Sequence, residues 1–238
     1  MLFMWMFAAA VVVVVVANAM NGQRVNASDR GDGRGSLRRI SALEIAADRG
    51  PRGTSRAGLR YYDVALGAAV AFAKCGTSAL EVGCVNPAFI EHLKWIPHRT
   101  CVSPYFAGYK ALNSTPSASS DDAEVDADDG TSYVRADFMN YDVGQRYDVV
   151  VCMQVVEHVR DPRAFVRKLL KAGDVVIISV PYKWRDCGAK CSHVSHDISL
   201  RTMANWSGGL EPTQTSIVRE RGDGAARLVV VYETTARA

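Results

Sequence analysis

Three polar side chains follow a strongly apolar stretch of the sequence. The run 149–153 has the length and β-branched composition of a strand that is buried on both faces. Gln154, Glu157 and His158 come shortly after it. Such groups can hold a ligand or move a proton at neutral pH. We therefore predict a ligand site at the end of this strand. The alternative is that Glu157 and His158 are ordinary loop residues.

Short apolar runs alternate with helical patterns over most of the chain. Strands are expected at 79–83, 99–103, 133–136, 149–153 and 174–180, and helices at 59–73, 87–95, 104–112, 162–171 and 199–206. Two β-rich runs, 213–220 and 227–234, predict a hairpin. The order of these elements predicts an α/β fold with a doubly wound, mostly parallel sheet and a C-terminal antiparallel β-hairpin.

Polar or glycine residues end several of these strands. Glu81 and Gly83 close the first strand, Asp137 and Phe138 the third, and Gln154 the fourth. In a doubly wound sheet the C-terminal strand ends share one crevice. A glycine turn lets the backbone approach a ligand, an aspartate can accept from an exocyclic amine, and a phenyl ring can cover an aromatic base. The sequence therefore predicts one ligand site at these strand ends.

The ordered motifs resemble those of class I S-adenosylmethionine-dependent methyltransferases, and most closely the group often labelled methyltransferase type 11. The motifs are Leu80–Cys84, Ala136–Phe138, Tyr147–Val159 and Val176–Pro181. The resemblance spans roughly residues 59–234, including the final hairpin. It implies a Rossmann-like methyltransferase fold, S-adenosyl-L-methionine as cofactor, and transfer of a methyl group to a small molecule or to an exposed O or N acceptor.

The resemblance also implies roles for individual residues. Glu81, Gly83 and Cys84 would shape the turn under the methionine part of the cofactor, Asp137 would hold the adenine amine beside Phe138, and Met153 and Gln154 would line the pocket near the sulfonium. Methyl transfer is an in-line displacement, so positioning does most of the work. A hydroxyl acceptor would also need a general base, and His158 and His196 are the candidates.

Two groups of residues could bind a metal ion, but we predict none. Some family members hold Mg²⁺ through Glu-x-x-Glu-His and a later His; here Gln154, a poorer ligand for a hard cation, replaces the first Glu. A second group, Cys187, Cys191, His193 and His196, has zinc-binding residue types. Its spacing is too compressed for the common zinc patterns.

Two departures from the family pattern keep other functions open. Val85 and Pro87 stand where the family's turn has glycines, and Cys101–Tyr105 lacks the acid that usually grips the ribose. The alternative is a catalytically weak or inactive binding module that kept the fold and is tethered to a membrane. A nicotinamide oxidoreductase is disfavoured, because no Gly-x-Gly-x-x-Gly follows the first strand.

The N-terminal part of the chain differs from the rest. Residues 1–17 contain no charged side chain and are about long enough to span a membrane as a helix. We expect 1–19 to be a signal peptide or membrane anchor, 20–57 a flexible linker, and 58–238 the folded domain, with a disordered acidic insertion near 113–130. The expected location is a membrane or the secretory pathway; the alternative is the cytoplasm.

Composition limits the remaining possibilities. With 238 residues, 48% of them hydrophobic, the chain can build one domain with a substantial core. A net charge of +3 gives no nucleic-acid signature, so the expected partner is a small-molecule substrate, and the oligomeric state is unknown. Most of the 6 cysteines lie in or beside apolar runs and are expected to be free and buried rather than a disulfide framework.

Overall fold

The computed structural model describes residues 59–84, 88–104, 124–126, 130–185, 192–220 and 225–234. The strands in these ranges are β1 (Ser78–Val82), β2 (His98–Val102), β3 (Glu124–Asp126), β4 (Thr131–Val134), β5 (Tyr147–Met153), β6 (Gly173–Pro181), β7 (Gln214–Arg219) and β8 (Ala226–Glu233). The helices are α2 (Arg60–Ala73), α3 (Pro162–Ala172) and α4 (Leu200–Ser207), with short 3₁₀ helices η2 (Phe89–His92) and η3 (Val156–His158).

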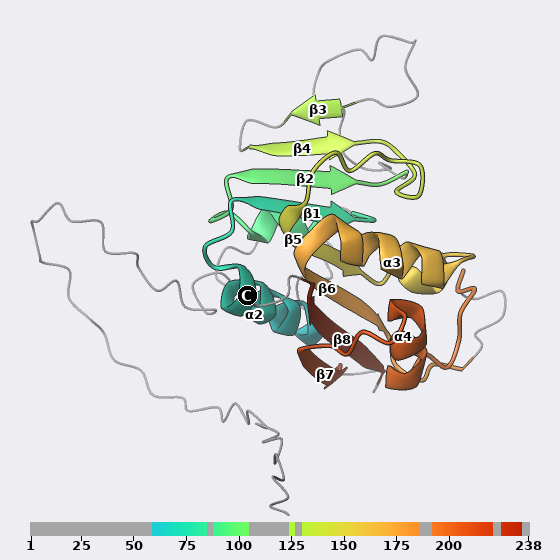
Figure 1. The fold of residues 1–238 in the computed structure, drawn as a ribbon. Coiled ribbons are helices and arrows are strands. Elements are labelled where there is room, and N and C mark those ends of the chain that lie inside the picture. Colours follow the sequence, from blue (N-terminus) through green and yellow to red (C-terminus); the bar gives the residue numbers. More distant parts are fainter. Residues whose placement is uncertain are drawn as a thin grey trace, which may run out of the picture. The chain divides into compact units, whose positions relative to one another are not determined.

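All the described strands belong to one sheet with the order β3-β4-β2-β1-β5-β6-β8-β7 (Figure 1). The strands β4, β2, β1, β5 and β6 run parallel to one another. β8 pairs antiparallel with both β6 and β7, and β3 pairs antiparallel with β4. The predicted doubly wound, mostly parallel sheet and its C-terminal antiparallel hairpin are therefore confirmed.

Helices cover both faces of the sheet and bury two apolar clusters. One cluster packs the sheet against α3 and α4, and the other packs it against α2 and η2 (Figure 1). The start of α3 follows from its sequence: Pro162 occupies the first turn, and the Asp161 carboxylate accepts a hydrogen bond from the amide of Ala164 at 3.0 Å. The apolar residues of α3 then recur at helical spacing and face the sheet.

Asp148 ties the start of β5 to the loop before β1. Its Oδ2 atom accepts hydrogen bonds from the amides of Thr77 and Ser78 at 2.7 and 2.9 Å, and from their hydroxyls at 3.1 and 3.0 Å. Burial would raise the pKa of Asp148, but these hydrogen bonds favour the ionised form and lower the pKa below its usual value. The carboxylate therefore joins residues 71 positions apart in the sequence.

We expect Asp148→Ala to lower the free energy of unfolding by about 2 kcal/mol at pH 7, because it removes a set of hydrogen bonds to a charged group. The folded-state pKa lies below the unfolded one, so this stability is present above about pH 4 and is lost as the pH falls through the folded-state pKa. Urea denaturation of the wild type and the variant, at pH 7 and at pH 3, measures the difference in unfolding free energy at each pH. A difference between wild type and variant that stays constant over this range would contradict the assignment.

Two expectations about local structure are wrong in detail. The helix expected at 87–95 is a short 3₁₀ segment, since backbone hydrogen bonds there join residues three apart, as from Leu93 to Ile90 and from Ile96 to Leu93. Within the expected disordered insertion at 113–130, Glu124–Asp126 forms β3. A short strand there satisfies backbone groups that β4 would otherwise leave unpaired at the sheet edge.

Several expectations fall outside the described residues. These are the segment 1–17, the linker, nearly all of the helix expected at 104–112, and most of the acidic insertion. None of the helices in the described ranges is both long and apolar enough to cross a membrane.

Candidate functional site

The parallel strands bring the predicted site residues to one edge of the sheet. In the ladder, Glu81 lies beside Cys101 of β2 and Val151 of β5, and Cys101 lies beside Tyr133 of β4. The chain therefore leaves β1, β4 and β5 at the same, C-terminal edge. β4 and β5 are three strand spacings apart in the sheet order, which is about 14 Å. This separation suits an elongated small molecule.

Gly83 places the end of β1 in contact with the segment that follows β5. Its φ of 83° lies in the left-handed region, and its amide donates to the carbonyl of Val102 at 2.8 Å. A Cβ atom at this position would overlap the side chain of Val155. Glycine is therefore required here both for the backbone conformation and for the close approach of Val155.

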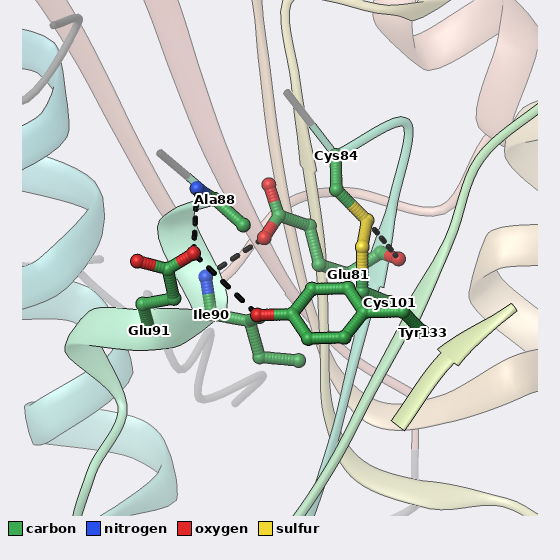
Figure 2. Close-up of a disulfide and its surroundings, with 7 residues drawn as sticks. All are labelled: Glu81, Cys84, Ala88, Ile90, Glu91, Cys101 and Tyr133. Carbon is green, nitrogen blue, oxygen red and sulfur yellow. Dashed lines mark hydrogen bonds between the residues drawn. A yellow bond between two sulfur atoms is a disulfide. The ribbon is translucent and has the colours of Figure 1, made fainter. Parts of the chain in front are cut away.

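Glu81 lies under this turn in the interior. Its side chain is 2% exposed, and its Oε2 atom accepts a hydrogen bond from the amide of Ile90 at 2.7 Å (Figure 2). The carboxylate therefore ties η2 to the end of β1. The Glu81 side chain thus acts on the backbone, by accepting from the Ile90 amide. Its role in shaping the turn under the cofactor remains a prediction.

Cys84 and Cys101 form a disulfide on the α2 face of the sheet (Figure 2). The expectation that these buried cysteines are free is wrong. The turn at Gly83 brings Cys84 back over β2, where its Cα lies 6.1 Å from that of Cys101, within the usual range for a disulfide. The pairing joins residues 17 positions apart and depends on the turn, which the cysteine spacing alone does not reveal.

Asp137 and Phe138 lie where the chain leaves β4. Asp137 is exposed, and its Oδ1 atom accepts from the amide of Met139 at 2.9 Å. Phe138 is 3% exposed; its ring packs edge-on against Phe165 at 5.3 Å, and the ammonium of Lys168 lies over it. The Asp137 carboxylate is thus accessible at the edge, whereas the Phe138 ring packs under α3. The roles of both residues toward adenine remain predictions.

Met153 and Gln154 end β5 in different environments. Met153 is buried in the core on the α2 face. Gln154 has a φ of 57°, its amide donates to the Ser179 carbonyl at 2.9 Å, and its side-chain Nε2 donates to the Ser179 hydroxyl at 3.2 Å. Ser179 was not predicted as a site residue, although a polar residue inside the apolar run of β6 was a visible signal.

Left-handed backbone conformations gather at this edge. Among the described non-glycine residues, positive φ occurs at Gln154 after β5, at Lys183 after β6, and at Asp197 before α4. Each such conformation costs on the order of 1 kcal/mol for an L-residue and persists where surrounding contacts hold it, as often happens at functional sites. Two such contacts are backbone hydrogen bonds: the Lys183 amide donates to the Ile198 carbonyl, and the Asp197 amide donates to the Trp184 carbonyl.

His158 has a fixed ring orientation. Its Nδ1 atom lies 3.0 Å from the backbone carbonyl of Ser192 and 3.0 Å from the Ser192 hydroxyl. A carbonyl only accepts, so the contact with it favours the tautomer in which Nδ1 carries the proton and donates. In that tautomer the Nε2 lone pair of the neutral ring is available. Nε2 lies 4.0 Å from Oε1 of the buried Glu157.

The segment after β6 brings two further histidines to His158. The amides of Val194 and Ser195 donate to the Glu157 carbonyl at 2.7 and 3.0 Å. The His193 ring consequently lies 4.8 Å from that of His158 and 6.3 Å from that of His196, between centroids. Burial, and then the neighbouring imidazoles, lower the pKa of His193 and favour its neutral form.

Glu157, His158 and His193 could together hold a metal ion. One ligand atom from each lies within 4.8 Å of the others. One carboxylate and two imidazoles suit borderline divalent ions such as Zn²⁺ or Mn²⁺, and metal-bound histidines commonly donate their other N–H to a carbonyl, as His158 does to Ser192. The zinc-type group considered in the sequence differs, and its Cys187 and Cys191 lie outside the described residues.

Comparison with known proteins identifies the fold. The sequence matches no protein-family model and no curated protein. N-methyltransferase NodS from Bradyrhizobium japonicum WM9, in complex with S-adenosyl-L-homocysteine, is similar in structure, with a TM-score of 0.55 and 12% identity over 74% of this chain and 86% of that one. Magnesium protoporphyrin IX methyltransferase (ChlM) from Synechocystis PCC 6803, with bound S-adenosyl-L-homocysteine, gives a TM-score of 0.51 and 14% identity over 80% and 93%.

A third neighbour agrees with these two. An S-adenosylmethionine-dependent methyltransferase from Clostridium acetobutylicum ATCC 824 gives a TM-score of 0.51 and 8% identity over 74% of this chain and 91% of that one. Identities this low show a common fold. The described domain has the Rossmann-like fold of the class I S-adenosylmethionine-dependent methyltransferases.

Proposed function

We propose that the protein binds S-adenosyl-L-methionine at the C-terminal edge of the sheet and transfers its methyl group to a small molecule or to an exposed O or N acceptor. The observation that supports this most is the placement of Gly83, Asp137 and Gln154 at one edge of a methyltransferase fold. The solved structures of NodS and ChlM hold S-adenosyl-L-homocysteine, which is the product of the cofactor.

The proposed cofactor lies along the edge from β4 to β5. Asp137 would accept from the adenine amine, the turn at Gly83 and Cys84 would pass under the methionine part, and Gln154 would lie near the sulfonium. The reaction breaks the bond between sulfur and methyl as the bond to the acceptor forms, so the main task of the protein is to align the two groups. Ser103 directly follows β2, in the segment where the family usually has an acid that contacts the ribose. It is buried, and its amide donates to the Val134 carbonyl.

His158 is the proposed general base for an acceptor that must lose a proton. Its ring is held through Nδ1 by Ser192, so Nε2 is the atom that would take the proton. The Glu157 carboxylate, 4.0 Å away, would stabilise the resulting imidazolium. His196 is the second candidate, and its ring centroid lies 6.3 Å from that of His193.

Calorimetry with the full chain and S-adenosyl-L-homocysteine tests the cofactor site. We expect Asp137→Ala to weaken binding by about tenfold or more, since it removes a hydrogen bond to a charged group. Asp142→Ala is a matched control, because Asp142 is also exposed and also accepts from a backbone amide two residues on, that of Gly144 at 3.0 Å. Equal effects of the two variants would remove Asp137 from the site.

The same titration separates the enzyme from the alternative function. A binding module that has lost the cofactor would show no heat with S-adenosyl-L-homocysteine up to millimolar concentration, and this result would exclude the methyltransferase. In that case Val85→Gly should be tested next. Binding that appears only in this variant would support an inactive descendant of the fold.

A metal-assisted form of the same reaction is the second candidate. The cluster of Glu157, His158 and His193 favours it, because a divalent ion held there would bind an acceptor hydroxyl and lower its pKa. We expect the full chain to bind Zn²⁺ or Mn²⁺ in equilibrium dialysis, and His193→Ala to weaken binding by tenfold or more. His98→Ala, at an exposed position at the start of β2, is the control. Unchanged binding in His193→Ala would exclude this cluster.

We further propose that residues 1–17 direct the protein to a membrane or to the secretory pathway. The uncharged apolar sequence of this segment supports the proposal. Fractionation of cells that express the full chain with a C-terminal tag tests it. Recovery in the soluble cytoplasmic fraction alone would contradict it.

A further inference from the structure

We propose that Cys84 and Cys101 are a redox-active pair that controls cofactor binding: the disulfide holds the turn after β1 in its binding conformation, and reduction releases it. The inference rests on the proposed methyltransferase function and adds regulation of the same site. It starts from the position of the disulfide: Cys84 directly follows Gly83, at the edge of the sheet where the cofactor is proposed to bind.

Two adjacent links attach this turn to β2. The amide of Gly83 donates to the carbonyl of Val102 at 2.8 Å, and Cys84 is bonded to Cys101, the residue before Val102. The backbone hydrogen bond is easily exchanged for one to water, whereas the covalent bond is not. Without the disulfide, the links that the described residues provide between the turn and β2 are this hydrogen bond and side-chain packing.

The disulfide also encloses the segment that Glu81 holds. The closed loop runs from Cys84 to Cys101 and contains Ile90, whose amide donates to the buried Glu81 carboxylate. Figure 2 draws this hydrogen bond between the Glu81 carboxylate and the Ile90 amide in the same close-up as the disulfide. The end of β1, the start of η2 and the end of β2 are therefore fastened around one turn.

The described part of the turn, Gly83 and Cys84, belongs to the proposed cofactor site, where it would pass under the methionine part. The disulfide therefore fixes a backbone segment that the cofactor would contact. A turn that is already fixed loses less conformational entropy when a ligand binds, so we expect the oxidised protein to bind the cofactor more tightly than the reduced one.

The redox step needs a thiol reductant, either a small dithiol or a protein with a reactive dithiol. A thiolate of the reductant attacks one sulfur of the pair, the S–S bond breaks, and a mixed disulfide forms. The second thiol of the reductant, as a thiolate, then attacks the mixed disulfide and displaces the cysteine that is still bound to it. In total the reductant loses two electrons and becomes a disulfide, and Cys84 and Cys101 each gain a proton. Both cysteines are buried, so attack requires the turn to open.

The buried Cys152 does not take part in this exchange. Burial raises the pKa of the Cys152 thiol well above its ordinary value, and the carboxylates of Glu157 and Glu81 raise it further. Cys152 therefore stays protonated and unreactive. Cys75 is exposed, follows the end of α2, and provides a control position.

The experiment compares the affinity of the oxidised and reduced full chain for S-adenosyl-L-homocysteine. Dithiothreitol is the reductant, and alkylation with mass spectrometry reports the state of Cys84 and Cys101. We expect reduction to weaken binding by tenfold or more. Equal affinity, or tighter binding after reduction, would overturn the inference and leave the proposed function intact. Absence of binding in both states would overturn both.

Linkage supplies an independent measurement. If oxidation tightens binding tenfold, saturating S-adenosyl-L-homocysteine must make the reduction potential of the pair more negative by about 30 mV. The affinity of Cys75→Ser should respond to dithiothreitol as the wild type does, whereas the Cys84→Ser/Cys101→Ser variant should bind weakly with or without it. A potential that does not move with ligand would contradict the inference even if the double variant fails to fold.

Discussion

Gly83→Ala is expected to cause the largest loss of any single substitution at the site. A residue with a side chain at a φ of 83° adds backbone strain, and the new Cβ would overlap Val155. We expect the strain and the overlap together to lower the free energy of unfolding by about 3 kcal/mol, measured by urea denaturation. We also expect at least tenfold weaker binding of S-adenosyl-L-homocysteine, because Val155 must move and it follows Gln154.

Two further variants separate the effect of backbone strain from that of the overlap with Val155. Gly144 has a φ of 66° but no atom within 4 Å of the position of an added Cβ, so Gly144→Ala measures strain alone, about 1 kcal/mol. In the Gly83→Ala background, Val155→Ala removes the overlapping side chain and should restore part of the stability. If Gly144→Ala and Gly83→Ala lose the same stability, the contact with Val155 is unimportant.

Reduction of the Cys84–Cys101 disulfide is expected to cost about 3 kcal/mol of unfolding free energy, because it releases the constraint on a loop of this length in the unfolded chain. Urea denaturation with and without dithiothreitol measures the difference. The prediction concerns stability and can hold even if cofactor affinity does not change.

The control for the stability experiment is the exposed free thiol. Cys75→Ser should leave both the stability and its dependence on dithiothreitol unchanged, since Cys75 has no disulfide partner. A wild-type protein whose urea midpoint does not move on reduction, with both thiols shown to be alkylated, would show that the pair contributes nothing to stability.

The sheet could be predicted because local patterns determine its parts. Continuous apolar runs such as Val149–Met153 specify strands buried on both faces, and Asp161-Pro162 specifies the start of a helix. Alternation of strands and helices then leaves few topologies. The convergence of Asp137 and Gln154 on one edge follows from this topology and is a property of the backbone, not of a particular contact.

Features that depend on tertiary contact could not be predicted. The Cys84–Cys101 pairing requires the turn at Gly83 to return over β2, and neither cysteine has a local signal for it. The approach of His193 to His158 depends on two amides that donate to the Glu157 carbonyl from a segment far along the chain. The packing of the Phe138 ring on Phe165 likewise follows from the position of α3.

The place of β8 in the sheet has a consequence for the order of folding. β8 follows the other described strands in the chain but lies between β6 and β7. Until it is synthesised, β6, with its buried run Val175–Val180, presents an unpaired apolar edge. Such edges pair readily with other chains. A nascent chain released before β8 emerges should therefore aggregate, and chaperone contact should be concentrated on β6 during synthesis.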